Sequence, residues 1–101
     1  MSTIHIDKIQ TKIILNILRK YFPNEKFFVF GSRATQKNLK KFSDLDIAID
    51  GPTKIQVSTL SKAAEEFSIS DLPFKVDLVD LNSISTEFKK SIESDFVELT
   101  L

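Results

Sequence analysis

The chain has no cysteine, no tryptophan, one histidine and only two glycines among its 101 residues. Without cysteine it can form no disulfide, no thiolate zinc site and no cysteine nucleophile. The single histidine, His5, stands next to the N-terminus, so we expect it to have no role, and we expect no Ser-His-Asp triad. Carboxylates, hydroxyls and basic side chains remain as the groups that can carry chemistry.

The chain also lacks a net charge, because its 14 basic residues balance its 14 acidic ones. It therefore has no positive excess of the kind that nucleic-acid binders use, and we expect no strong direct nucleic-acid binding. No apolar stretch approaches the ~20 residues that span a bilayer, and no secretory signal is evident at the N-terminus. We expect a cytoplasmic protein without membrane association, built as one domain over residues 1–101.

Hydrophobic periodicity predicts the long helices. Residues 6–22 are predicted to form a helix, and Asp7 with Gln10 can cap its start. Its apolar stripe consists of the residues at helical spacing Ile6, Ile9, Ile13 and Ile17. Thr53–Gln56 has capping-box form and precedes a second helical pattern that runs to Phe67. Residues 83–99 are predicted to form a last helix. Its apolar face consists of Ile84, Phe88, Ile92 and Phe96.

Three short apolar runs are predicted to be strands. They span Phe27–Phe30, Leu45–Ile49 and Lys75–Leu81. Because these strands alternate with helices, the pattern favours a sheet with helices packed on it.

The first strand runs directly into Gly31-Ser32-Arg33-Ala34. Glycine allows phosphate to approach the main chain, and Ser32 would start a short helix whose N–H groups and hydroxyl can bind an anion. Arg33 can reach phosphate or, as an alternative, form a surface salt bridge. A Gly-Ser pair after a strand is also common in ordinary turns, and the spacing is not that of a Walker A loop.

Asp44 and Asp46 stand at the start of the second strand, two residues apart. Side chains alternate along a strand, so both carboxylates face the same side. They would repel each other unless a cation lies between them, and Mg²⁺ prefers such oxygen ligands. An exposed acidic pair without a ligand is the alternative interpretation.

Asp77 is a third candidate, because it lies inside the apolar third strand, where an unpartnered carboxylate is costly. If the third strand lies beside the second, Asp77 can join Asp44 and Asp46 and act as a general base. Asp80 has the opposite parity and is expected to point to the other face of the sheet.

Together these motifs resemble the minimal nucleotidyltransferase (MNT) family of the polymerase-β-type superfamily, over nearly the whole chain. That family's pattern is a Gly-Ser turn, an Asp-x-Asp pair and a third Asp on a later strand. The resemblance implies the nucleotidyltransferase fold, which is α/β (α+β) with a small mixed sheet and helices packed on it. It also implies roles for the matching residues. Gly31 and Ser32, with Arg33 beside them, would bind ATP. Asp44 and Asp46 would hold two Mg²⁺ ions, and Asp77 would complete the metal site and assist deprotonation of the acceptor.

Many small stand-alone members of that family are antitoxins paired with a HEPN-domain toxin, and some transfer AMP from ATP to a tyrosine of that toxin. The resemblance therefore implies a protein adenylyltransferase that acts as an antitoxin and forms a hetero-oligomer with its toxin. Two features depart from the family pattern, namely Gln36, where a glycine is common, and a loop before Ser43 that is about one residue longer. They motivate an alternative, a catalytically weak or inactive antitoxin that neutralises its partner by forming a complex with it. Transfer to RNA ends or to a small molecule is a third hypothesis, which the neutral charge disfavours.

Overall fold

The computed structural model of the chain describes residues 6–35 and 44–100. Helices and strands alternate along these residues, and the four strands form a single sheet of order β3-β2-β1-β4. β1 pairs antiparallel with both β2 and β4, whereas β2 pairs parallel with β3, so the sheet is mixed as expected. The elements are α1 (Lys8–Tyr21), β1 (Lys26–Phe30), α2 (Ser32–Thr35), β2 (Leu45–Asp50), α3 (Val57–Ser68), β3 (Val76–Asp80), α4 (Thr86–Glu93) and β4 (Val97–Glu98).

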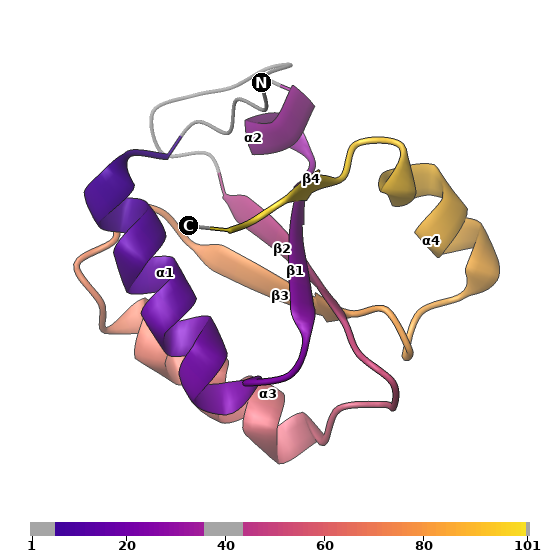
Figure 1. Ribbon diagram of the computed structural model, residues 1–101, viewed down its shortest axis with the longest axis horizontal. Coiled ribbons are helices and arrows are strands. Elements are labelled where there is room, and N and C mark those ends of the chain that lie inside the picture. The colour runs from indigo at the N-terminus through magenta and orange to yellow at the C-terminus, as the bar shows by residue number, and fades with distance from the viewer. Residues whose placement is uncertain (1–5, 36–43, 101) are drawn as a thin grey trace.

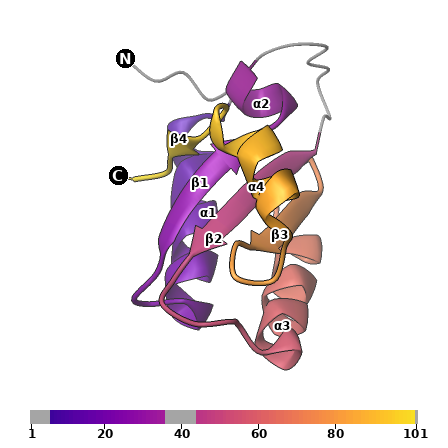
Figure 2. The same ribbon diagram turned by 90° about the vertical axis from the view of Figure 1, so that its right-hand side faces the viewer.

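The helices cover the two faces of the sheet unequally. α1 and α3 lie side by side on one face, and the shorter α4 lies on the other (Figures 1 and 2). α2 lies at the end of the sheet where β1 finishes and where β2 and β3 begin (Figure 2). Within the described ranges, no helix has the length and apolar character needed to cross a membrane.

Side-chain alternation along the strands creates a separate apolar layer on each face. On the face of α1 and α3, the buried strand residues join the buried side of α1 and Phe67 of α3 in the main core. On the face of α4, Phe30 and Ala48 pack with Leu81 and Ile92 in a smaller cluster. Asp46 lies between Leu45 and Ile47 in β2, so it belongs to the α4 face, which α4 covers only in part. The strands that hold the acidic residues are therefore fixed by packing on both sides.

α1 follows the sequence prediction closely, with one exception. The Asp7 carboxylate accepts a hydrogen bond from the Gln10 backbone N–H, and the Gln10 side chain accepts one from the Asp7 N–H, which confirms the capping box. Ile9, however, was expected on the apolar stripe and is 73% exposed. The buried face consists instead of Ile14, Leu15, Ile17 and Leu18.

The capping box predicted for Thr53–Gln56 is wrong. α3 begins at Val57, and its N-cap residue, Gln56, makes no capping hydrogen bond through its side chain. The preceding segment is held by the end of β3 instead. The Asp80 carboxylate accepts a hydrogen bond from the Ile55 N–H at 2.8 Å, and the Asn82 amide donates to the carbonyl oxygens of Gly51 and Thr53. Asp80 points toward the α3 side, as its parity predicted, and is 4% exposed.

The long helix predicted for residues 83–99 is also wrong. α4 ends at Glu93, and the chain then forms the short strand β4, which pairs with β1. Ile92 is buried but Phe88 is 44% exposed, so the predicted apolar face is only partly used. The ring of Phe96 stacks on that of Phe28, with centroids 5.1 Å apart. The strand pairing with β1 and this aromatic contact stabilise the chain after α4 more than a longer helix would. In a longer helix, the residues after Glu93 would gain only local hydrogen bonds.

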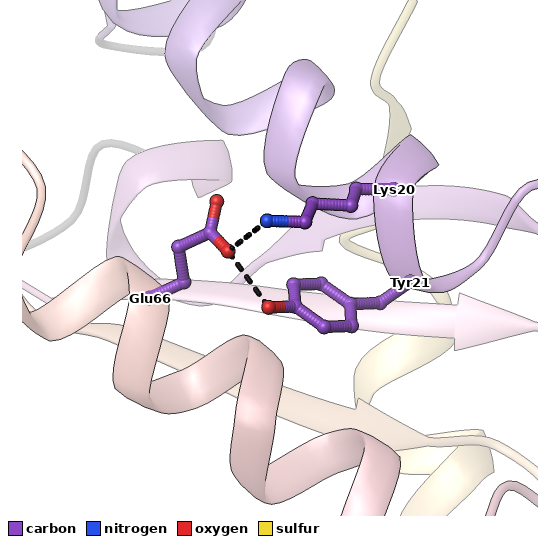
Figure 3. Close-up of polar contacts among 3 residues, drawn as sticks. All are labelled: Lys20, Tyr21 and Glu66. Atoms are coloured by element: carbon purple, nitrogen blue, oxygen red, sulfur yellow. Dashed lines mark hydrogen bonds and ion pairs between the residues drawn. The ribbon is translucent and has the colours of Figure 1, made fainter.

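A polar cluster of three residues links α1 to α3 on the outside of the helical layer (Figure 3). One carboxylate oxygen of Glu66 accepts from the Lys20 ammonium at 2.8 Å and from the Tyr21 hydroxyl at 2.7 Å. These hydrogen bonds, first that from Lys20 and then that from Tyr21, lower the pKa of Glu66. The Glu66 carboxylate is therefore ionised over a wider pH range than usual and joins the two helices.

Candidate active site

The site is built around the turn that follows β1. Gly31 has φ of 75°, a left-handed conformation that residues with a side chain rarely adopt. Its carbonyl oxygen accepts hydrogen bonds from the N–H groups of Ala34 and Thr35, at 3.1 and 3.0 Å, which closes the short helix α2. The predicted short helix starting at Ser32 is thereby confirmed. Glycine is required at position 31 because the backbone there is left-handed.

Gly31 also lies directly against one of the predicted acidic residues. Phe30 pairs with Asp46 across β1 and β2, which brings the turn beside that carboxylate. A Cβ atom added to Gly31 would lie 2.5 Å from the Asp46 Oδ2 atom, closer than side chains tolerate. The turn and the carboxylate thus share a space that only glycine leaves open.

Asp77 lies on the other side of Asp46. The parallel pairing of β2 and β3 places Asp46 opposite Asp77, so both side chains belong to the same face of the sheet. The side chain of Asp77 is 40% exposed, and its Oδ1 atom lies 3.5 Å from the ammonium of Lys75. The condition set by the sequence, that the third strand lies beside the second, is met.

Asp44 is exposed and precedes the first residue of β2. Its neighbour Leu45 donates its N–H to the Lys75 carbonyl at 2.8 Å, which ties the entrance of β2 to that of β3. Asp44 is therefore held at the same end of the sheet as Gly31, Asp46 and Asp77. All three predicted carboxylates lie around this end.

Electrostatics at this end favour a cation. Burial raises the pKa of Asp46 above its ordinary value, and the neighbouring charges of Asp77 and Asp44 raise it further. Among the described residues, no three acidic or histidine side chains converge closely enough to hold a metal ion by themselves. The oxygen donors nevertheless suit Mg²⁺, which commonly takes one or two carboxylates and completes its shell with water and substrate phosphates.

Arg33 is buried beside the site. The residue is 5% exposed, and its guanidinium carbon lies 4.1 Å from the centroid of the Phe74 ring. Burial lowers its pKa, but an arginine remains protonated at neutral pH. Its positive charge therefore lies against Phe74 in the segment before β3, and direct contact with a phosphate stays a prediction.

The sequence reasoning missed two neighbours of the site, Phe74 and Lys75. Phe74 supports the Arg33 guanidinium from the loop before β3, and no local pattern pointed to that contact. Lys75 shares strand parity with Asp77, which is a signal that could have identified the ion pair. Gln36, the longer loop and Ser43 lie outside the described residues.

With this geometry in view, comparison with known families gives the class of the protein. Residues 12–99 match the family described as polymerase β, nucleotidyltransferase, and the chain belongs to that family. Among curated proteins, it is similar to the probable protein adenylyltransferase MntA of Haemophilus influenzae (strain Rd). The two are 38% identical over 85 residues, which cover 84% of this chain and 74% of that relative.

Solved structures of toxin–antitoxin complexes show the same fold. A crystal structure of a toxin–antitoxin with AMP-PNP contains a chain that is 27% identical, with a TM-score of 0.74 over 89% of this chain and 72% of that one. A structure of the tri-AMPylated Shewanella oneidensis HEPN toxin in complex with its MNT antitoxin matches with a TM-score of 0.72 and 25% identity. That match covers 94% of this chain and 72% of the other. The predicted fold class is thereby confirmed.

Proposed function

We propose that this chain transfers AMP from ATP to a hydroxyl group, a tyrosine, of a partner HEPN-type toxin and so acts as the antitoxin of a toxin–antitoxin pair. The observation that carries the proposal is the juxtaposition of Gly31, which follows β1, with Asp46 of β2 and Asp77 of β3. The similarity to a probable protein adenylyltransferase and to chains from complexes with AMP-PNP and with an AMPylated toxin supports it.

In this mechanism the Gly31 turn holds the triphosphate. Glycine at position 31 leaves the main chain of Gly31 and Ser32 open to phosphate oxygens, and the positive charge of Arg33 in the same short helix attracts them. The carboxylates of Asp44 and Asp46 would hold Mg²⁺, with Asp77 completing the set. When bound, the metal neutralises the triphosphate and polarises the α-phosphate.

The transfer itself needs a base and an in-line approach. The acceptor oxygen forms a bond to the α-phosphorus of ATP while the bond from that phosphorus to the β-phosphate oxygen breaks, so pyrophosphate leaves. Asp77 is placed to take the proton from the acceptor hydroxyl, because its carboxylate is partly exposed at the edge of the site. The Asp46 carboxylate lies directly against Gly31, which suits a role in holding a cation rather than in exchanging protons.

Label transfer tests the proposal. Purified protein is incubated with Mg²⁺, ATP labelled at the α-phosphate, and lysate of the source cells or the purified toxin. We expect a labelled toxin with the wild-type chain and at least a hundredfold less label with Asp46→Asn, a loss of about 2.7 kcal/mol or more in transition-state stabilisation. Asp50→Asn is the matched control, since Asp50 is exposed at the far end of the same strand.

The same variants separate catalysis from binding. If Asp46→Asn abolishes labelling and also abolishes neutralisation of the toxin in cells, antitoxin action requires AMP transfer. If neutralisation survives in Asp46→Asn while labelling is lost, the alternative of an antitoxin that acts by binding is correct. Unchanged labelling by Asp46→Asn would contradict the proposed site.

A further inference from the structure

A cavity of about 770 Å³ opens between α3 and the edge strand β3, and it reaches the acidic end of the sheet. Asp44 and Asp77 line one part of it, and Ser61, Ala64, Phe67 and Phe74 line much of the remainder. Neither Gly31 nor Asp46 lines the cavity. The cavity is therefore connected with the reacting end of the site but lies away from the turn that would hold the triphosphate.

The geometry points to this cavity as the acceptor subsite, which binds an apolar side chain next to the tyrosine in an extended segment of the partner protein. This inference rests on the proposed function, because it takes the transfer of AMP to a protein hydroxyl as given. It adds the location of the acceptor and the chemistry of the residues that flank the tyrosine.

The direction of the reaction supports this location. Gly31, Asp46 and Asp77 lie in that order across β1, β2 and β3. The leaving pyrophosphate would lie on the β1 side, at the Gly31 turn. In-line displacement brings the attacking oxygen from the opposite side, which is the side of β3 and of the cavity.

The lining of the cavity comes from both faces of the sheet, and this indicates what kind of ligand can occupy it. Asp77 belongs to the face of α4, whereas Phe67 and Phe74 belong to the core on the α3 side. A ligand that uses both must pass around β3, which is an edge strand of the sheet. A polypeptide segment in extended conformation can do this, since successive side chains point in opposite directions and the backbone can pair with a strand edge.

The charges of the described part of the lining disfavour a phosphate group in the cavity. Among the residues that the structure describes, three charged side chains line it, those of Asp44, Lys75 and Asp77, and the Lys75 ammonium lies 3.5 Å from the Asp77 carboxylate. A triphosphate would therefore meet a net negative surface, whereas an uncharged apolar side chain meets aromatic rings and the hydroxyl groups of Ser61 and Ser68.

Filling the cavity tests the inference. Ala64 is exposed on α3 and lines the cavity, so Ala64→Phe should fill it without disturbing the core. Glu65→Phe is the matched control, because Glu65 is the next residue, is exposed and does not line the cavity. We expect Ala64→Phe to raise KM for the toxin about tenfold or more, while KM for ATP stays within about twofold of wild type. Ser61→Phe serves as the second variant if Ala64→Phe fails to fold.

Peptide binding to the cavity can be measured without AMP transfer. The probe is the peptide N-acetyl-Leu-Tyr-Leu-amide, titrated into ¹⁵N-labelled protein, with adenosine as the comparison. We expect the peptide, but not adenosine, to shift the amide signals of Ser61, Ala64 and Phe74, and we expect Ala64→Phe to abolish these shifts.

The outcomes distinguish the two proposals. If wild-type protein labels no toxin, the proposed function fails, and the acceptor role of the cavity fails with it even where the peptide occupies the cavity. If labelling occurs and Ala64→Phe labels the toxin as well as wild type does, the subsite is overturned and the function stands. Shifts caused by adenosine, or none caused by the peptide, would also overturn the subsite.

Discussion

Gly31 and Asp46 show how two residues constrain each other in this protein. The left-handed backbone at Gly31 starts α2, and the absence of a side chain leaves room for the Asp46 carboxylate. The carboxylate in turn is partly buried between the turn and Asp77, so its charged form is disfavoured until a cation arrives. Both features cost folding free energy, the first through an unusual backbone conformation and the second through a partly buried charge. Such costs are common in sites arranged for ligands.

Substitution of Gly31 by alanine tests the turn. We expect Gly31→Ala to lower the free energy of unfolding by about 1–3 kcal/mol, because the left-handed backbone becomes strained, and to abolish AMP transfer because Asp46 is displaced. Gly51→Ala is the control. Its Cβ would lie 2.7 Å from Cγ of the Glu25 side chain, which can move aside, and its backbone is not left-handed. Urea unfolding and label transfer are the measurements, and equal losses for the two variants would contradict this account.

The raised pKa of Asp46 predicts a gain in stability when its charge is removed. An acid whose pKa is raised in the folded state costs stability as pH rises through the interval from its ordinary value, 3.8, to its folded value. In the presence of EDTA, Asp46→Asn should therefore unfold at a higher Tm than wild type at pH 7. The difference should shrink toward pH 3, and Asp50→Asn should show no such gain. A lower Tm for Asp46→Asn at pH 7 would show that the carboxylate stabilises the metal-free fold.

At the level of elements, the position of α3 affects the site most directly. Its beginning is set by Asp80 and Asn82 at the end of β3, and its outer side is joined to α1 through Glu66. Between these two points α3 borders the cavity beside Asp77. The contacts of Asp80 and Glu66 thus hold the wall of the proposed acceptor subsite without touching any reacting group.

The joint between α1 and α3 should depend on pH. The hydrogen bonds from Lys20 and Tyr21 lower the pKa of Glu66 below its ordinary value of 4.5. Their contribution is therefore complete above pH 4.5 and is lost as pH falls through the lowered pKa. We expect Glu66→Gln to destabilise the protein modestly at pH 7, since the cluster is at the surface, and to match wild type in acid.

Glu65→Gln is the control for that experiment, because Glu65 is exposed on the same helix. Urea unfolding at pH 7 and at pH 3 measures both variants. If Glu66→Gln and Glu65→Gln behave alike at pH 7, the cluster does not join the helices.

For the whole molecule, the parallel pair β2–β3 and the antiparallel pair β1–β2 bring together residues that are distant in the chain. Gly31 and Asp77 come from opposite sides of β2, and the main core holds that strand from the α1 and α3 side. Binding of metal and nucleotide at this end should therefore stabilise the global fold and not merely one loop. The ligand would contact three strands at once.

Thermal unfolding measures this linkage. With Mg²⁺ and AMP-PNP at about one hundred times their dissociation constant, we expect the free energy of unfolding to rise by about 2.7 kcal/mol. In a domain of this size that corresponds to an increase in Tm of about 10 °C or more. EDTA should remove the increase, and Asp46→Asn should not show it. An equal shift in EDTA would mean that the nucleotide binds without metal.

The sequence by itself determined the elements with strong local patterns and the residues that carry the chemistry. The capping box of α1, the strands around residues 27–30 and 45–49, and the Gly31 turn were all predicted, because each depends on side-chain spacing or backbone preference over a few residues. Local patterns gave wrong predictions at the start of α3 and after α4. The capping pattern before α3 is replaced by a hydrogen bond to the distant Asp80, and the helical period after α4 is replaced by a contact with the distant Phe28.

Only the tertiary structure decided which carboxylates lie together. Strand parity allowed Asp44, Asp46 and Asp77 to share a face, but the register that places Asp46 opposite Asp77 arises from pairing between segments 31 residues apart. The burial of Arg33 against Phe74, and the cavity between α3 and β3, also come from long-range packing. Local sequence does not encode these positions, because they depend on how the helices and the sheet fill a common core.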